Sequence, residues 1–239
     1  MLFQAKRVLP FALFSVLLAG CASDNIQDIE AGYDQEAGAG PMAMAHVNHV
    51  AQSWMETPRQ VGLLTIARSE ATVASTHADL AVQRSSDSDW VKMHAVHVKH
   101  ALEPKGKGPG KGYGLIKAVK EVRQHIKLAI ASEDTSDAVA FHGEQIMMSA
   151  DSVLARIETL DALASQIIEA PRGTDFTLQA EEMSDLTSKI LLGDDINGDG
   201  NINWEENESG LDQALSYLEY LQEKEAAYHE QPITSRENE

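Results

Sequence analysis

The chain has 239 residues and is strongly acidic, since 37 Asp and Glu against 19 Lys and Arg give a formal net charge of −18 at pH 7. Such a charge repels phosphate backbones and attracts cations, which argues against a nucleic-acid-binding role. Aromatic residues make up only 5% of the chain, and no stretch alternates polar with apolar residues, so the sequence favours an all-α protein.

The first twenty residues have the pattern of an export signal. Lys6 and Arg7 precede a short apolar run over residues 8–18, which is too short to cross a bilayer as a helix. The run leads into Leu18-Ala19-Gly20-Cys21, which resembles the lipobox of bacterial lipoprotein signal peptides. The resemblance implies cleavage after residue 20 and acylation of Cys21, the single cysteine of the chain, which also excludes a disulfide within one chain.

These features predict where the protein resides. Several acyl chains hold a protein stably on a bilayer, so we expect a lipid anchor in the bacterial cell envelope. In the lipoprotein pattern an Asp after the cysteine usually marks inner-membrane retention, and Ala22 therefore favours the outer membrane, with the protein facing the periplasm. Residues 21–41 are acidic and lack apolar periodicity, which indicates a flexible tether between the lipid and the folded part.

From residue 42 onward, apolar residues recur at helical spacing. We predict helices over residues 42–55, 58–82, 89–102, 115–131 and 137–170, packed as an antiparallel helical bundle over residues 42–170. The second of these helices should turn one stripe of residues toward the core, which consists of Leu63, Ile66, Glu70, Val73, His77 and Leu80.

Residues 195–206 read Asp-Ile-Asn-Gly-Asp-Gly-Asn-Ile-Asn-Trp-Glu-Glu and fit the twelve-residue calcium loop of the EF-hand at every constrained position. Over about residues 177–225 the chain resembles the EF-hand calcium-binding family. The resemblance implies that the oxygen ligands of a calcium ion come from Asp195, Asn197, Asp199, Asn201 through its carbonyl, Asn203 directly or through a water, and Glu206. Gly200 stands where the loop turns sharply with a positive φ, which favours glycine.

The hand stands alone in the sequence. We expect an entering helix over residues 177–192 and an exiting helix over residues 204–225, in a module of residues 171–231 that is followed by a tail, residues 232–239. No second calcium loop is present, whereas EF-hands usually work in pairs. The apolar faces of the hand must therefore pack on the bundle, on another protein or on a second copy of the chain as a homodimer.

Most of the histidines fall in the bundle region. His77 and His142 lie on apolar stripes, and His97 and His125 lie close to the apolar faces of their own helices. One histidine from each of four helices, together with Glu70, could meet at a single transition-metal or haem centre inside the bundle. The alternative is that the histidines are ordinary core and surface side chains, whose ring nitrogens are hydrogen-bonded and bind no metal. The spacings of di-iron carboxylate bundles, of hemerythrin-like sites and of covalent haem attachment are all absent.

Two further patterns carry little function. The segment 105–114 alternates lysine and glycine, but it lacks the spacing of a phosphate-binding Walker loop and no strand precedes it, so we interpret it as a flexible interhelical loop. The chain has no nucleophile elbow and no zinc-protease motif, and we do not expect an enzyme.

The sequence therefore predicts a calcium-binding envelope lipoprotein in which the EF-hand stabilises or modulates a helical bundle. Three charged ligands indicate weak binding, with a Kd of about 10⁻⁵ to 10⁻³ M. The alternatives are a bundle that handles a transition metal or haem and has a structural EF-hand, and a calcium-gated protein-interaction module.

Overall fold

The computed structural model describes residues 38–230, so the signal segment, Cys21, most of the tether and the tail lie outside the described residues. Regular structure within this range is entirely helical, which confirms the expected all-α fold. The elements are α1 (Pro41–Ala51), η1 (Pro58–Gln60), α2 (Leu63–Gln83), α3 (Ser88–Leu102), α4 (Leu115–Ile130), α5 (Asp137–Glu169), α6 (Thr177–Leu192), η2 (Glu205–Asn207) and α7 (Leu211–Glu230).

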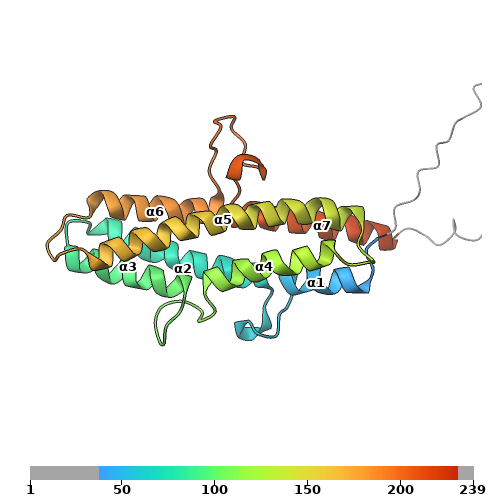
Figure 1. The fold of residues 1–239 in the computed structure, drawn as a ribbon, viewed down its shortest axis with the longest axis horizontal. Coiled ribbons are helices and arrows are strands. Elements are labelled where there is room, and N and C mark those ends of the chain that lie inside the picture. Colours follow the sequence, from blue (N-terminus) through green and yellow to red (C-terminus); the bar gives the residue numbers. More distant parts are fainter. Residues whose placement is uncertain (1–37, 231–239) are drawn as a thin grey trace, which may run out of the picture. The chain divides into compact units, whose positions relative to one another are not determined.

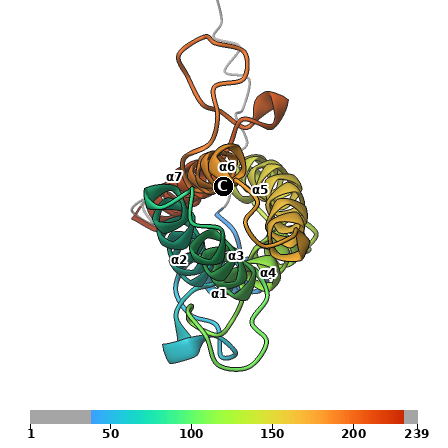
Figure 2. The same cartoon turned by 90° about the vertical axis from the view of Figure 1, so that its left-hand side faces the viewer.

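The α-helices form a bundle of four antiparallel columns (Figures 1 and 2). Helix α5 makes one column alone. Each of the other columns consists of two shorter helices placed end to end, namely α1 with α2, α3 with α4, and α6 with α7 (Figure 1). Helix α5 packs against α3, α4, α6 and α7, while α2 packs against α3, α4 and α6. The two helices of the predicted EF-hand therefore form one column of the bundle, which extends beyond the predicted residues 42–170.

Small residues form the buried face of α2. After the larger Leu63, Leu64 and Ile66 of its first turn, the apolar buried residues of α2 are all alanines spaced three or four apart, namely Ala67, Ala71, Ala74, Ala78 and Ala81. Of the predicted stripe, Val73 is partly buried and packs against the core, whereas the expectation for His77 and Leu80 is wrong, since both are only partly buried at the edge of it. Alanine has no side chain beyond Cβ, so this face lets α2 approach its neighbours closely. His77 consequently lies at the edge of α2, next to α3.

Three segments leave the bundle where two short helices of a column meet: residues 52–62, 103–114 and 193–210 (Figure 1). The first segment corrects the prediction of a helix beginning at Pro58. Arg59 and Gln60 have φ values of 63° and 55°, and a Cβ on Gly62 would lie 2.6 Å from the backbone of Ala51. Helix α2 therefore begins at Leu63, after a close approach that glycine allows.

The segment between α6 and α7 departs from the predicted hand at one end. Helix α6 occupies the predicted range, but the exiting helix begins at Leu211 and not at residue 204. Asn207 has a left-handed φ of 64°, which interrupts a helix. Gly210 then passes so close to Gly193 that a Cβ would lie 2.4 Å from the Gly193 nitrogen. The loop is therefore longer than in the predicted hand.

Candidate metal sites

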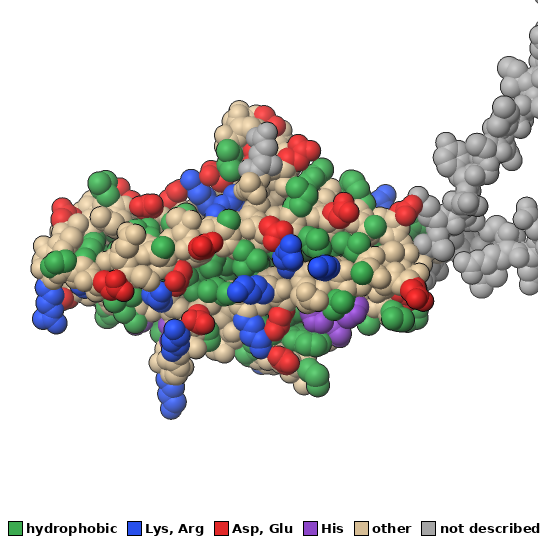
Figure 3. Space-filling view, viewed as in Figure 1, with side chains coloured by type: hydrophobic (Ala, Val, Ile, Leu, Met, Phe, Trp, Pro, Cys, Tyr) green, Lys and Arg blue, Asp and Glu red, His purple; other side chains and the backbone are tan. Residues whose placement is uncertain are grey.

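The acidic segment of residues 194–210 projects from the bundle between α6 and α7, and Figure 3 shows acidic side chains on this projection. Its first half curls around its own side-chain oxygens. The Asp195 carboxylate accepts the backbone N–H of Gly198 at 2.8 Å and that of Gly200 at 3.0 Å. Bonds of the same kind link the N–H groups of Asp199, Asn201 and Glu205 to the side chains of Asn197, Asp199 and Asn203 at 2.9, 2.8 and 2.6 Å. Gly200 has the expected positive φ, 87°.

An acid beyond the end of the motif enters this loop. Glu206 lies in η2, and its side chain is outside the described residues. Glu208 is fully buried, and its carboxylate accepts the backbone N–H of Asn197 at 3.2 Å and that of Asn203 at 3.3 Å. Sequence reasoning missed Glu208 because it lies two positions beyond the end of the EF-hand pattern, and because its approach depends on the late start of α7.

Arg156 on α5 holds the end of the acidic loop. Its guanidinium donates to the carbonyl oxygens of Lys189, Ser209, Asn207 and Glu208 at 3.2, 2.5, 2.5 and 2.9 Å. Burial lowers the pKa of Arg156 from its ordinary value, and the nearby Asp194 raises it. A guanidinium stays charged even so. One cation therefore ties the C-terminal end of α6 to the last residues of the loop.

Glu70, one of the residues expected at a shared metal centre, has a structural role. Its side chain is 1% exposed, and its carboxylate accepts the backbone N–H groups of Lys111, Tyr113 and Gly114 at 2.8, 2.9 and 3.0 Å. The carboxylate fixes the end of the segment 103–114 against α2. These three bonds occupy three of the roughly four lone-pair sites of the carboxylate.

The single centre expected from His77, His97, His125 and His142 is wrong. His142 pairs with Gln145 on its own helix, with 2.9 Å between Nδ1 and Oε1. The other three histidines divide between two groups on different helix pairs. They lie at the edges between neighbouring helices, where the small core residues leave room for rings, and not in the middle of the bundle.

The first group, here the α1–α4 cluster, consists of His46 and His49 on α1 and His125 on α4. The Nδ1 atom of His125 lies 3.1 Å from Nδ1 of His46 and 3.4 Å from Nδ1 of His49. All three rings are partly buried, and Figure 3 shows histidine side chains at the surface over α1 and α4. The Trp54 ring lies beside the cluster, 4.6 Å from the His49 ring and 4.7 Å from the His125 ring.

The second group, here the α2–α3 cluster, consists of His77 on α2 and His94 and His97 on α3. Nδ1 of His77 lies 3.0 Å from Nδ1 of His94, and the rings of His77 and His97 are 4.5 Å apart. His94 is only 3% exposed, and the Trp90 ring lies 4.5 Å from its ring. The predicted centre left out His46, His49 and His94, although the spacing His-x-x-His occurs at both places and was the available signal.

Burial affects the protonation of both clusters. It lowers the pKa of His77 and that of His125 to about 4, with a further lowering from the neighbouring histidines. Burial also lowers the pKa of His49, His94 and His97, again with help from a histidine neighbour. At pH 7 these rings are therefore neutral and each has a nitrogen lone pair, which is the form that binds a metal ion.

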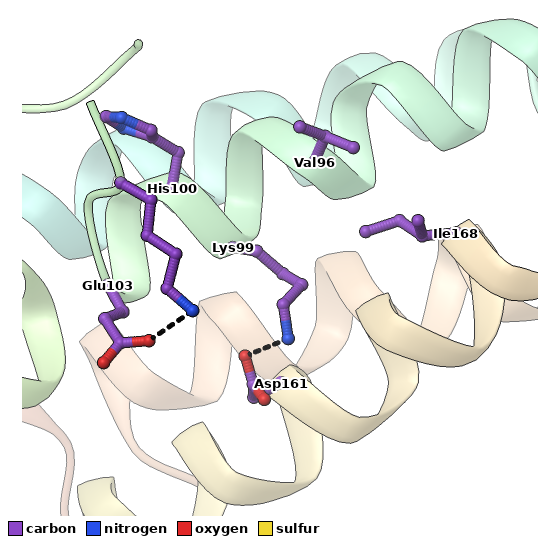
Figure 4. A pocket seen from close by; sticks show the side chains of 7 residues that line it. Val96, Lys99, His100, Glu103, Asp161 and Ile168 are labelled. Atoms are coloured by element: carbon purple, nitrogen blue, oxygen red, sulfur yellow. Dashed lines mark hydrogen bonds and ion pairs between the residues drawn. The ribbon is translucent and has the colours of Figure 1, made fainter. Parts of the chain in front are cut away.

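A hollow of about 260 Å³ between α3 and α5 is a weaker candidate (Figure 4). Two of its charged side chains, Lys99 and Lys105, are paired with Asp161 at 2.7 Å and with Glu103 at 3.1 Å. Because these charges are neutralised within the hollow, it presents no free ionic group to a ligand.

No protein-family model, curated protein or solved structure matches the chain. Each helix within residues 38–230 is too short or too polar to cross a membrane.

Proposed function

We propose that the protein is a calcium-binding lipoprotein of the bacterial cell envelope, in which the ion binds in the acidic loop between α6 and α7 and stabilises the helical bundle there. The observation that carries the proposal is the curl of residues 195–203 around the side-chain oxygens of Asp195, Asn197, Asp199 and Asn203. Carboxylate, amide and carbonyl oxygens are the ligands that calcium takes in proteins.

The buried acid of the loop adds a second argument. Glu208 is fully buried, and its charge is compensated there by two backbone N–H groups. A buried carboxylate next to Asp195 and Asp199 accumulates negative charge in one loop, which a divalent cation would neutralise. We therefore expect Glu208 to act as a calcium ligand together with, or in place of, Glu206.

The setting of the loop indicates what the ion would do. Arg156 already ties the exit of the loop to α5, so an ion bound at its entrance would fix the remaining free part. A Cβ on Gly193 would lie 2.6 Å from Cγ2 of Ile202, so this apolar residue at position 8 packs on its own chain. A role of calcium in stabilising the bundle therefore has more support than calcium-gated partner binding or a homodimer. Those two alternatives stay predictions.

Calcium titration of loop variants tests the proposal. Isothermal titration of the wild-type chain should show one calcium ion per chain, with a Kd of about 10⁻⁵ to 10⁻³ M. Asp195→Asn should weaken binding at least tenfold, because it removes one of the ligand charges. Glu208→Gln and Glu206→Gln, measured side by side, identify the acid that closes the site.

Glu205→Gln is the matched control. Glu205 is exposed, next to Glu206 and three residues before Glu208, so removing its charge changes the local electrostatics without removing a predicted ligand. Wild-type affinity in Asp195→Asn, or equal weakening in Glu205→Gln and in both other glutamate variants, would remove the loop as a calcium site.

The anchor is tested separately. Wild-type protein expressed in a bacterium should fractionate with membranes and carry acyl chains on the residue 21 cysteine by mass spectrometry. Cys21→Ala should be recovered in the soluble fraction. Membrane association of Cys21→Ala equal to that of the wild type contradicts lipid anchoring.

A further inference from the structure

We propose that the bundle contains two transition-metal centres, the α1–α4 cluster and the α2–α3 cluster, each with three histidine ligands. They are separate from the calcium loop and differ from it in ligand chemistry. In each cluster one ring nitrogen from every histidine lies within 4.8 Å of the others.

The two clusters are built in the same way. Two histidines three residues apart, His46 and His49 or His94 and His97, project from one face of a helix, because residues at this spacing are neighbours on a helix surface. The third histidine comes from the adjacent helix. A tryptophan ring lies beside each group, Trp54 next to His49 and His125, and Trp90 next to His94.

Hydrogen-bonding capacity argues for an ion in the α1–α4 cluster. Nδ1 of His125 faces the Nδ1 atoms of both His46 and His49. A neutral imidazole nitrogen has either one N–H or one lone pair, so it forms one good hydrogen bond and not two. Three converging lone pairs are all satisfied by one cation. With metal–nitrogen bonds of 2.0–2.1 Å and tetrahedral angles, ligand nitrogens are about 3.3–3.4 Å apart, close to the 3.1 and 3.4 Å found here.

Unsatisfied nitrogens argue for an ion in the α2–α3 cluster. Nε2 of His94 and Nδ1 of His97 are both buried without a hydrogen-bond partner. Buried polar atoms without a partner are rare in folded proteins, because leaving one unpaired costs about 1–3 kcal/mol. A metal ion bound by His97 through Nδ1 would remove the cost at that atom. The 3.0 Å between Nδ1 of His77 and Nδ1 of His94 fits a shared ion, to which His94 contributes Nδ1 and not Nε2.

The ligand set indicates the class of metal. Imidazole nitrogen suits zinc, copper, nickel and iron, whereas calcium and magnesium require oxygen ligands. Neither group includes a carboxylate or a thiolate. Three protein ligands leave a fourth coordination position for water or another small ligand. A hollow of about 230 Å³ lined by His49, Ser53, Trp54, Met55 and Gln60 adjoins the α1–α4 cluster, so its fourth position is reachable from solvent.

Zinc stoichiometry tests the two centres. The full chain, dialysed against Zn²⁺ with millimolar Ca²⁺ present, should retain two zinc ions by elemental analysis. His125→Gln and His97→Gln should each retain one ion, and the double variant none. His142→Gln is the control, because His142 lies outside both clusters, and it should retain two.

Tryptophan fluorescence gives an independent readout, since the chain has three tryptophans and each cluster has its own. Cu²⁺, a quencher of nearby indoles, should quench Trp54 and Trp90. Each effect should disappear only in the histidine variant of the same cluster. Circular dichroism identifies a variant that fails to fold, and the partly exposed His77 and His49 provide alternative substitutions to His97 and His125.

The outcomes separate this proposal from calcium binding. Loss of calcium affinity in Asp195→Asn should leave two zinc ions bound, and loss of zinc in the histidine variants should leave calcium affinity unchanged. Folded wild-type protein that retains no zinc, or folded His125→Gln and His97→Gln proteins that retain two ions each, would overturn the assignment and leave two networks of hydrogen-bonded histidines.

Discussion

Replacement of Arg156 by methionine should lower the free energy of unfolding more than the removal of an exposed ion pair does. The methionine keeps the apolar stem of the side chain and removes the guanidinium, which donates to four carbonyl oxygens at the end of α6 and in residues 207–209. The carbonyl oxygens would be left without this donor, and the acidic loop would lose its attachment to α5.

The size of the effect follows from these bonds. A hydrogen bond to a charged group contributes about 1.5–3 kcal/mol when removed singly, but bonds from one side chain are not additive. The carbonyl of Asn207 is exposed and regains water, so we expect a net loss of about 3 kcal/mol in the free energy of unfolding. For a chain of this size that loss lowers Tm by about 6–12 °C.

Urea denaturation of three variants measures it. Arg156→Lys should lie between wild type and Arg156→Met, because an ammonium group reaches fewer of the carbonyls than a planar guanidinium does. Arg123→Met is the control. It breaks an exposed pair with Asp151 at 2.6 Å, and such a pair contributes about 0–1 kcal/mol. Equal losses in Arg156→Met and Arg123→Met would refute the reasoning.

Two further predictions concern buried groups. His77 and His125 have pKa values of about 4 in the folded chain, against about 6.5 in an unfolded chain. The unfolded chain therefore binds protons first as the pH falls. The contribution of these two groups to the stability of chelator-treated protein should be constant above about pH 6.5 and should fall as the pH is lowered from 6.5 to 4. Thermal unfolding of a His77→Gln/His125→Gln variant should show a shallower fall, and an identical fall would contradict the assignment. Glu70→Gln should cost about 2–4 kcal/mol, because an amide offers one acceptor oxygen to three N–H groups. Urea denaturation and amide exchange at residues 111–114 check this, and a loss no larger than that of the exposed Glu103→Gln would show that the carboxylate does not hold the loop.

The sequence pattern correctly predicted those structural features that depend on residues close together in the chain. The range of α6 and the positive φ of Gly200 followed from the sequence alone, since both depend on residues a few positions apart. The late start of α7 and the entry of Glu208 into the loop depend on Arg156, which is distant in the sequence and packs on the loop only in the folded chain. No local pattern contains that contact.

The histidine clusters show the same limit. The pairs His46/His49 and His94/His97 were visible as spacings, but the third ligand depends on how each helix is rotated against its neighbour. Hydrophobicity alone placed Val73 inward on α2, whereas close packing placed the smaller Ala74 there. That difference of one residue moved His77 from the predicted interior to the edge where His94 and His97 meet it.

The end-to-end columns have a consequence for cooperativity. Helices α1, α4 and α7 lie toward one end of the bundle and α3 and α6 toward the other, while α2 packs against both α3 and α4 (Figure 1). Helix α5 thus spans both halves of the bundle, and each half contains one of the two histidine clusters. A metal ion bound to one cluster should slow amide exchange mainly in its own half. A proline inserted at the midpoint of α5 should weaken the coupling between the halves, so that they unfold at separate temperatures.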